Sequence, residues 1–330
     1  KRNLSKSINF GKGSTFPLRK FELHKLDVDS LASSTTLTKA DALKYFKDMT
    51  AIRLMENEAG KLYMEKSIKG FCHLYSGQEA CAVGIEAAIS RDDSIITAYR
   101  CHGWAYTRGA SISEILCELT GRVTGCSKGK GGSMHIYAHE FYGGNGIVGA
   151  QVPVGAGIAL AHKLRNNGRI CVTLYGDGAA NQGQVFESFN MAALWKLPVI
   201  FVCENNKFGM GTSTERAAAC SKFYTRGDYI PGIQVDGNCI LSVREATRFC
   251  HNWCLAGKGP IVVELVTYRY SGHSMSDPGT SYRTVEDVQQ ARKTNDPINY
   301  FSSLITQSGL VAESELEEIK EKLQTQVEEA

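Results

Sequence analysis

The 330-residue chain is long enough for one large α/β domain or two modest ones, and it can bury a sizeable core without disulfide support. Its 43% hydrophobic and 22% charged residues are typical of a folded globular protein and exclude wholesale disorder. The formal net charge of +3 has a local origin, because six of the 37 lysines and arginines precede the first acidic residue, Glu22. The remainder is slightly acidic, which argues against a nucleic-acid partner.

Residues 1–36 form a basic segment that we expect to be flexible. This composition is typical of the tail of an organellar transit peptide, and equally of a plain disordered terminus. The 11 cysteines are scattered through apolar segments without a Cys-x-x-Cys pair, so we expect buried free thiols. No apolar run approaches the roughly 18 residues of a membrane-spanning helix, and we expect no membrane span.

Helical patterns dominate the first third of the chain. Apolar spacing predicts a long helix over 38–66, a second over 77–89, and a third over 111–119 that begins with the capping pair Ser111 and Glu114. A short strand is predicted over 94–98. The region 121–149 holds nine glycines and little periodicity, so we predict a long loop, a kind of segment that often carries function.

A regular α/β alternation follows this loop. We predict helices over 151–164, 182–195 and 243–255, and strands over 170–175, 199–203, 229–235 and 261–267. Unbroken apolar strands between helices are typical of a mostly parallel sheet with helices on both faces. We therefore expect an α/β domain over 37–283, with N- and C-terminal helical additions, the latter a charged extension over 284–330.

Polar residues follow two neighbouring predicted strands. Gly176-Asp177-Gly178 ends one, and Asn205-Asn206 ends the next. Because the carboxyl ends of parallel strands meet at one edge of a sheet, Asp177 and Asn206 are expected to converge there. Hard oxygen donors of this kind suit Mg²⁺, which completes its shell with phosphate oxygens and water. Gly-Asp-Gly alone is more often a plain turn, but the Asn-Asn pair favours a site for metal and diphosphate.

Two other patterns point to different ligands and are disfavoured. The run 144–149 matches the dinucleotide pattern Gly-x-Gly-x-x-Gly, but it follows a loop, and Arg169 stands about twenty residues on where an acidic ribose ligand belongs. His135 and His139 are four residues apart, yet no third ligand or glutamate base accompanies them. We expect them to be loop histidines rather than zinc ligands.

The combined Gly-Asp-Gly and Asn-Asn motif is that of thiamine diphosphate and Mg²⁺ sites, and the chain resembles the thiamine diphosphate-dependent 2-oxo acid dehydrogenases from about Phe21 to its end. The segments most similar to alpha subunits of the pyruvate dehydrogenase decarboxylating component are 71–74, 129–135, 141–151, 190–197 and 270–283. The resemblance implies a thiamine diphosphate-binding fold, with Mg²⁺ held by Asp177, Asn206 and the carbonyl of Phe208.

The resemblance also implies roles around the cofactor. His73, His273 and Tyr99 are the implied catalytic residues, near the diphosphate and the pyruvate pocket. The implied cofactor-binding residues are Tyr99, Arg100, Ala138, Gly146, Val148, Gly178, Ala179, Asn206 and His273. Arg100 follows the predicted strand 94–98, and a guanidinium there suits phosphate, although a surface ion pair explains such an arginine equally well.

The segment 270–283 is rich in Gly, Pro, Ser and Asp, which predicts a mobile, turn-rich loop. By itself it is most simply a surface loop. The resemblance implies that Ser274 and Ser281 in this loop, and Ser213 elsewhere, are inhibitory phosphorylation sites. The family commonly has histidine where this chain has Ser271.

The implied activity is oxidative decarboxylation of pyruvate with reductive acetylation of a lipoyl group on the acyltransferase component, leading to acetyl-CoA. The chain has length for one α/β unit, so the resemblance implies a beta subunit that supplies the activating glutamate in an α₂β₂ heterotetramer. It further implies a regulatory kinase and phosphatase, and the mitochondrial matrix. The alternatives are a branched-chain 2-oxo acid or acetoin dehydrogenase alpha subunit, or a non-catalytic nucleotide-binding module, but the run GGNGIVGAQVP favours pyruvate.

Overall fold

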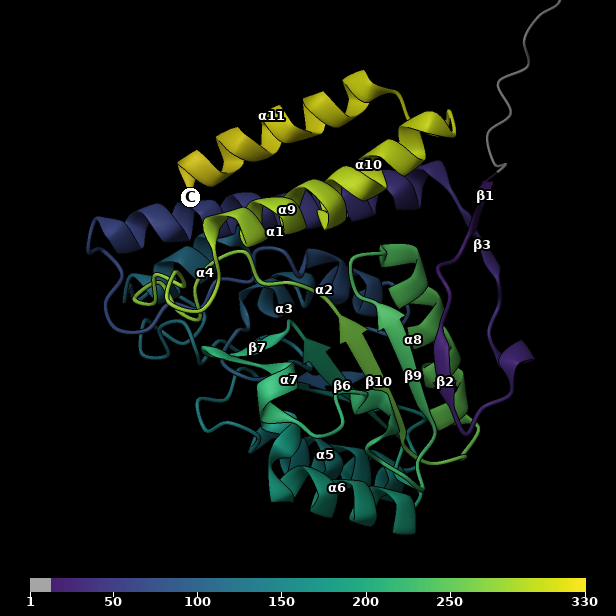
Figure 1. The fold of residues 1–330 in the computed structure, drawn as a ribbon. Coiled ribbons are helices and arrows are strands. Elements are labelled where there is room, and N and C mark those ends of the chain that lie inside the picture. Colours follow the sequence, from purple (N-terminus) through teal and green to yellow (C-terminus); the bar gives the residue numbers. More distant parts are fainter. Residues whose placement is uncertain (1–12) are drawn as a thin grey trace, which may run out of the picture.

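The computed structural model describes residues 13–330, and its centre is a six-stranded sheet (Figure 1). Its strands are β2 (Glu22–His24), β4 (Ser94–Ile96), β5 (Cys171–Gly176), β6 (Val199–Asn205), β9 (Gly232–Asp236) and β10 (Ile261–Val266). They lie in the order β2, β9, β10, β6, β5, β4, and the edge strand β2 is antiparallel to β9 while the other pairs are parallel. The predicted α/β class with a mostly parallel sheet is confirmed.

Side chains of the central strands alternate between two apolar layers. In β6, Ile200 and Val202 join the larger core, whereas Phe201 and Cys203 join a smaller one on the opposite face. The smaller core lies under α5 (Gln151–Arg165) and α6 (Gly183–Leu194), and the larger one under α2 (Glu79–Glu86) and α8 (Ile240–Leu255). Figure 1 shows α5 and α6 below the sheet, with α2 above it and α8 beside β9. Both faces are therefore covered, which explains the unbroken apolar strands.

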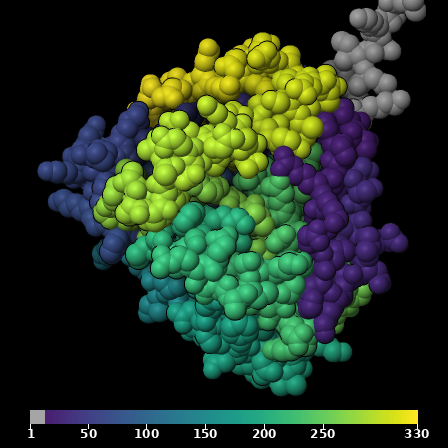
Figure 2. Space-filling model, in the orientation of Figure 1, coloured from purple at the N-terminus to yellow at the C-terminus, as the bar shows by residue number. Residues whose placement is uncertain are grey.

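The remaining helices form a second layer and the connections. They are α1 (Lys39–Met64), α3 (His102–Thr107), α4 (Ile112–Leu119), α7 (Thr214–Ala217), α9 (Val285–Asn295), α10 (Pro297–Gln307) and α11 (Glu313–Glu329). α10 and α11 pack on α1, and in Figure 2 these C-terminal residues cover the top of the molecule in yellow. Three single turns of 3-10 helix complete the connections: η1 (Val28–Ser30), η2 (Ala179–Asn181) and η3 (Phe223–Thr225).

We expected residues 1–36 to be flexible, but residues 13–36, the part that the structure describes, form strands and contacts with the rest of the chain. Residues 1–12 lie outside the described residues, but β1 (Ser14–Pro17) and β3 (Ser34–Leu37) pair with each other, and β2 extends the central sheet. The physical reason is that Phe16 is buried and that Arg19 pairs with Asp236 and lies over the ring of Tyr300. A basic residue that finds a carboxylate and an aromatic face holds the segment in place.

Most helix and strand boundaries lie within a few residues of their predicted positions, and the exceptions have local causes. The second helix begins at Glu79 instead of 77, because Gly77 adopts a positive φ of 100°. β9 begins after Pro231, which has no backbone N–H for the sheet. α3 was not predicted, since its six residues are too few to display a helical period. None of the helices among residues 13–330 is long and apolar enough to cross a membrane.

Candidate functional site

The carboxyl ends of β4, β5 and β6 lie side by side and open into one cavity of about 240 Å³. Its wall contains nine of the residues proposed from the sequence: Tyr99, Arg100, Val148, Asp177, Gly178, Ala179, Asn206, Phe208 and His273. They come from three strand ends, the glycine-rich loop and the 270–283 loop. The parallel sheet therefore gathers residues that are up to 174 positions apart, counting from Tyr99 to His273.

Asp177 is the buried carboxylate of this cavity. Its side chain is almost completely enclosed, and its Oδ2 atom has no hydrogen-bond partner among the described residues. Burial raises the pKa of Asp177 to about 6. A buried carboxylate oxygen without a partner is costly in the unliganded chain, so the position fits a bound cation.

Asn206 and Phe208 follow the carboxyl end of β6, the strand next to β5. Asn206 donates from Nδ2 to Gln78 Oε1 at 3.2 Å and accepts at Oδ1 from the Phe208 amide at 3.4 Å, which fixes the direction of its amide oxygen. Phe208 begins the hairpin of β7 (Phe208–Gly209) and β8 (Thr212–Ser213). One carboxylate, one amide and one carbonyl are hard donors that match Mg²⁺. Across residues 13–330, no cluster of three or more His, Cys, Asp or Glu is placed to hold a metal ion.

Two glycines face each other beside Asp177. A Cβ added to Gly209 would lie 3.1 Å from the Cα of Gly178, and one added to Gly178 would lie 3.3 Å from the Cα of Gly209. Any side chain at either position would crowd the other strand end. The chain then turns through η2 into α6, and Gly178 and Ala179 at this turn line the cavity. The first N–H groups of a helical segment have no partner within it and can bind an anion.

Arg100 places a buried positive charge in the same wall. Its guanidinium donates to the carbonyl of Leu74 at 2.7 Å and to that of His273 at 2.8 Å, and no carboxylate in the described part of the chain forms an ion pair with it. Burial, followed by the nearby Arg269, lowers the pKa of Arg100 to about 10. A guanidinium held by carbonyls alone keeps donors and charge for an anionic ligand.

Three aromatic rings cluster next to Arg100. The ring of His73 lies 4.5 Å from that of Tyr99 and 5.4 Å from that of His273, between centroids. Burial, with Arg100 second, lowers the pKa of His73 to about 2 and that of His273 to about 4, so both imidazoles are neutral at pH 7. His73 does not line the cavity itself but contacts both rings that do.

Two proposed cofactor-binding residues lie away from the cavity wall. Ala138 forms an isolated bridge with Phe141 and packs against the core, and a Cβ on Gly146 would face the ring of His135 at 3.4 Å. Conversely, Gln78 and Glu204 line the cavity and were not predicted. Glu204 accepts a hydrogen bond from the Tyr75 hydroxyl, and burial raises its pKa to about 7. The only signal in the sequence that could have predicted a role for Glu204 is its position as a charged residue at the end of an apolar strand.

The three serines proposed as phosphorylation sites differ in exposure. Ser281 is exposed, Ser213 is half-buried at the end of β8, and Ser274 is buried with its hydroxyl 2.7 Å from that of Ser276. Asp277 holds this loop by accepting from the backbone N–H of His273 at 2.6 Å.

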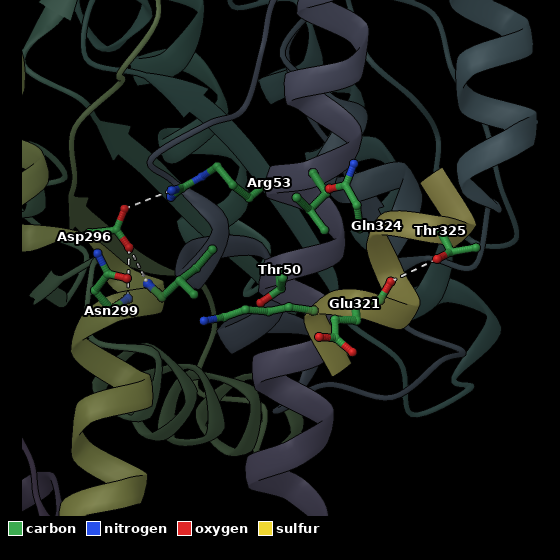
Figure 3. A pocket seen from close by; sticks show the side chains of 10 residues that line it. Thr50, Arg53, Asp296, Asn299, Glu321, Gln324 and Thr325 are labelled. Atoms are coloured by element: carbon green, nitrogen blue, oxygen red, sulfur yellow. Dashed lines mark hydrogen bonds and ion pairs between the residues drawn. The ribbon is translucent and has the colours of Figure 1, made fainter. Parts of the chain in front are cut away.

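A second cavity of about 550 Å³ lies between α1, α10 and α11 (Figure 3). Arg53 at its floor donates to Asp296 at 2.9 Å and to Glu79, so its charge is already paired. None of the residues proposed for the cofactor lines it. The larger cavity is therefore not the place where the strand ends converge.

The comparison with known proteins agrees with this geometry. The dehydrogenase E1 component family matches residues 47–330. The chain belongs to this family. Dehydrogenase E1 components are thiamine diphosphate-dependent, which agrees with a cavity that combines a buried carboxylate, opposed glycines and an unpaired guanidinium.

Similar dehydrogenase E1 chains cover nearly all of this one. It is 61% identical to the probable pyruvate dehydrogenase E1 component subunit alpha, mitochondrial, of Caenorhabditis elegans over 316 residues, 96% of this chain and 79% of the relative. It is 58% identical to the human somatic-form pyruvate dehydrogenase E1 component subunit alpha, mitochondrial, over 329 residues, 100% of this chain and 84% of the relative. It is also 58% identical to the type I alpha subunit of Ascaris suum over 317 residues, 96% of this chain and 80% of the relative.

Proposed function

We propose that this chain is the alpha subunit of a pyruvate dehydrogenase component, acting with thiamine diphosphate and Mg²⁺ in the mitochondrial matrix. The observation that carries the proposal is the unpartnered, buried oxygen of Asp177, which faces a cavity at the strand ends of a dehydrogenase E1 chain. The relatives named for pyruvate, all of them mitochondrial, support the substrate and the compartment.

In this proposal the chain's own residues bind and orient. Asp177, Asn206 and the carbonyl of Phe208 hold Mg²⁺, while Gly178 and Ala179 let a diphosphate approach the backbone. When bound, thiamine diphosphate supplies the carbanion that adds to a 2-oxo acid and the electron sink for decarboxylation. Arg100 offers its guanidinium to an anionic group.

The substrate side of the proposed site is formed by three rings. His73, Tyr99 and His273 lie together, and the two imidazoles are neutral, so they can accept or donate one hydrogen bond without adding charge. Enclosure by these rings excludes water from the reacting carbon. We propose them as the catalytic residues contributed by this chain.

The proposed assembly is an α₂β₂ heterotetramer. We propose that a beta subunit supplies the glutamate that activates the cofactor, and that the product acyl group passes to a lipoyl-bearing acyltransferase component. We further propose that a kinase and a phosphatase act on Ser213, Ser274 and Ser281. The relatives' names, which call each a subunit alpha of a component, support a multi-chain assembly.

Asp177→Asn tests the metal assignment. We expect Mg²⁺-dependent thiamine diphosphate binding, measured by titration calorimetry, to weaken by at least about 100-fold, since one charged ligand is lost. Asp48→Asn, on the exposed side of α1, is the matched control and leaves binding unchanged. Equal affinity in the Asp177 variant and the native protein contradicts the proposed metal site.

A substrate panel separates the alternatives. With the beta subunit present, pyruvate should be turned over faster than branched-chain 2-oxo acids, which are also decarboxylated, or acetoin, which has no carboxylate and is cleaved instead. A preference for either of those replaces pyruvate with the corresponding dehydrogenase. Tight thiamine diphosphate binding without turnover of any of them favours a non-catalytic module.

A further inference from the structure

Four buried polar groups from four separate segments form one hydrogen-bonded line beside the cavity. They are the carboxylate of Glu56 on α1, the imidazole of His102 on α3, the hydroxyl of Ser133 in the glycine-rich loop and the backbone N–H of His73. His102 Nδ1 lies 2.9 Å from Glu56 Oε2, His102 Nε2 lies 2.9 Å from Ser133 Oγ, and the His73 amide nitrogen lies 3.1 Å from the same Oγ.

The chemistry of these groups fixes the direction of each bond. A carboxylate only accepts, so His102 donates from Nδ1 to Glu56, and in the tautomer with its proton on Nδ1 the ring accepts at Nε2 from the Ser133 hydroxyl. The Ser133 oxygen then keeps a lone pair for the His73 N–H. Every member of the line is satisfied in this arrangement, which a buried polar network requires to be stable.

The line ends on a residue whose side chain has no polar anchor of its own. The Nδ1 atom of His73 is buried without a partner among the described residues, although the ring contacts Tyr99 and His273. The position of the ring therefore depends on its backbone and on packing. The other oxygen of Glu56 accepts from the Tyr75 N–H at 2.8 Å, so one carboxylate holds the chain on both sides of Leu74.

We propose that His102 and Ser133 are positioning residues, which with Glu56 fix the backbone of His73 and so set its ring against Tyr99 and His273. This proposal adds positioning residues to the proposed function, and the effect that it predicts on kcat for pyruvate rests on that function. It predicts that the two residues affect the reaction through His73 and not through cofactor or metal.

The order carboxylate, imidazole and hydroxyl also occurs in nucleophilic triads, but a nucleophile needs access to substrate. Ser133 is 4% exposed and does not line the cofactor cavity. Its oxygen is also engaged by His73, so this serine acts as a fixed link rather than as a nucleophile.

The first test is Ser133→Ala in the assembled enzyme. We expect kcat for pyruvate to fall roughly 10- to 100-fold, as slight misplacement of an active-site group does, while the cofactor Kd changes less than about twofold. Ser188→Ala is the matched control, because it removes a buried hydroxyl from α6 that bonds only the Gln184 carbonyl. A parallel loss of cofactor affinity would show a merely structural role and overturn the proposal.

A double-mutant cycle tests whether Ser133 acts through His73. In a His73→Ala background, Ser133→Ala should cause no further loss of kcat, because the ring to be positioned is gone. Full additivity of the two losses overturns the proposal.

Two substitutions of His102 by an amide residue test its two hydrogen bonds one at a time. His102→Gln reaches the former Nε2 position and keeps the Ser133 contact, whereas His102→Asn reaches only the Nδ1 position and keeps the Glu56 contact. We expect the glutamine variant to retain more activity than the asparagine variant. Equal losses in both contradict the proposal.

Hydrogen exchange distinguishes this proposal from the proposed function. Ser133→Ala should lower amide protection in the peptide 71–75, whatever substrate the enzyme uses, and Ser188→Ala should not. If pyruvate is not turned over but protection falls, the function is wrong and the positioning stands. If protection is unchanged, the positioning is wrong.

Discussion

Asp177 and Arg100 are both buried in one cavity wall, and neither forms an ion pair within residues 13–330. Gly-Asp-Gly together with the Asn-Asn pair made the position of Asp177 predictable, since the carboxyl ends of neighbouring parallel strands meet at one edge of the sheet. The location of Arg100 at the third strand end was also predictable. Its freedom from ion pairs was not, because burial and partners depend on distant segments such as the 270–283 loop.

The two proposed cofactor-binding residues that do not line the cavity lie in the same loop. Ala138 and Gly146 lie in the glycine-rich loop, which has no period from which the direction of a residue can be inferred. Glu204 escaped prediction because its burial is a property of the neighbouring strands. The position of a residue relative to the cavity can therefore be inferred from the sequence at strand ends but not in a long loop without a period.

The neutral His73 predicts a pH dependence of stability. Its pKa is about 2 in the folded chain, far below the value of about 6.5 when unfolded, so below pH 6.5 only the unfolded chain takes up this proton. Stability is unaffected above that pH and falls as the pH drops towards the folded pKa. One such proton contributes a slope approaching about 1.4 kcal/mol per pH unit.

We expect His73→Asn to flatten the fall in unfolding free energy between about pH 6 and pH 4 by up to this amount, measured by urea denaturation. Ser188→Ala, which removes a buried group that does not titrate, should leave the slope as it is. An unchanged slope in the His73 variant would mean that this imidazole is protonated in the folded chain.

At the scale of elements, Arg53 joins three of them. From α1 its guanidinium donates to Asp296, the N-cap of α10 (Figure 3). It also donates to Glu79 at the start of α2, and its Cζ lies 5.1 Å from the ring centroid of Tyr270. Glu79 is completely buried and also accepts from the Gly77 N–H at 3.1 Å. These contacts tie the upper helices to the segments that border the cofactor cavity.

Arg53→Met should therefore cost about 3–5 kcal/mol of unfolding free energy, because it leaves two buried carboxylates unpaired. Lys44→Ala breaks an exposed pair on the same helix and should cost at most about 0.5 kcal/mol. Denaturant unfolding of both variants checks this. In Arg53→Met/Glu79→Gln part of the loss should be recovered, and no recovery would argue against unpaired charge as the cause.

The 270–283 loop predicts an effect of charge at Ser274. This serine is buried beside Ser276 and near Asp277, so a phosphoryl group of about −1.5 to −2 charge would be repelled and would open the loop that carries His273. Ser274→Glu should lower pyruvate-dependent CO₂ release markedly, whereas Ser274→Ala should lower it little. Ser303→Glu on the exposed side of α10 controls for added charge. Activity in Ser274→Glu equal to that of the control variant contradicts the prediction.

Helices and strands were predictable from the sequence where the apolar pattern extends over many residues. α1, α5, α6 and the central strands lie within a few residues of their predicted bounds, because their apolar faces repeat over several turns or fill a whole strand. β1, β2 and β3 escaped prediction because three- and four-residue strands carry too few side chains to alternate visibly. Arg19, between β1 and β2, contacts Asp236 and Tyr300, which lie over 200 residues away and give no local signal.

For the whole molecule, the proposed division of the active site predicts that the purified chain alone is inactive. Mixing it with the beta subunit should restore pyruvate-dependent CO₂ release and produce an α₂β₂ mass in analytical ultracentrifugation. The Asp177→Asn chain should assemble with the beta subunit but remain inactive. Full activity of the isolated chain would show that the site is complete without a partner.

The carbonyl-held guanidinium of Arg100 has a consequence for how this protein survives in its cell. Within residues 13–330 its guanidinium bonds only carbonyl groups, so an anion that binds there, as we propose for the diphosphate, stabilises the folded chain by mass action. Substitutions far from the cavity that cost about 1–2 kcal/mol then reduce the amount of intact protein mainly when the vitamin-derived ligand is scarce. We therefore expect the abundance of such a variant, measured by immunoblot in cells grown with graded thiamine, to fall as thiamine becomes scarce.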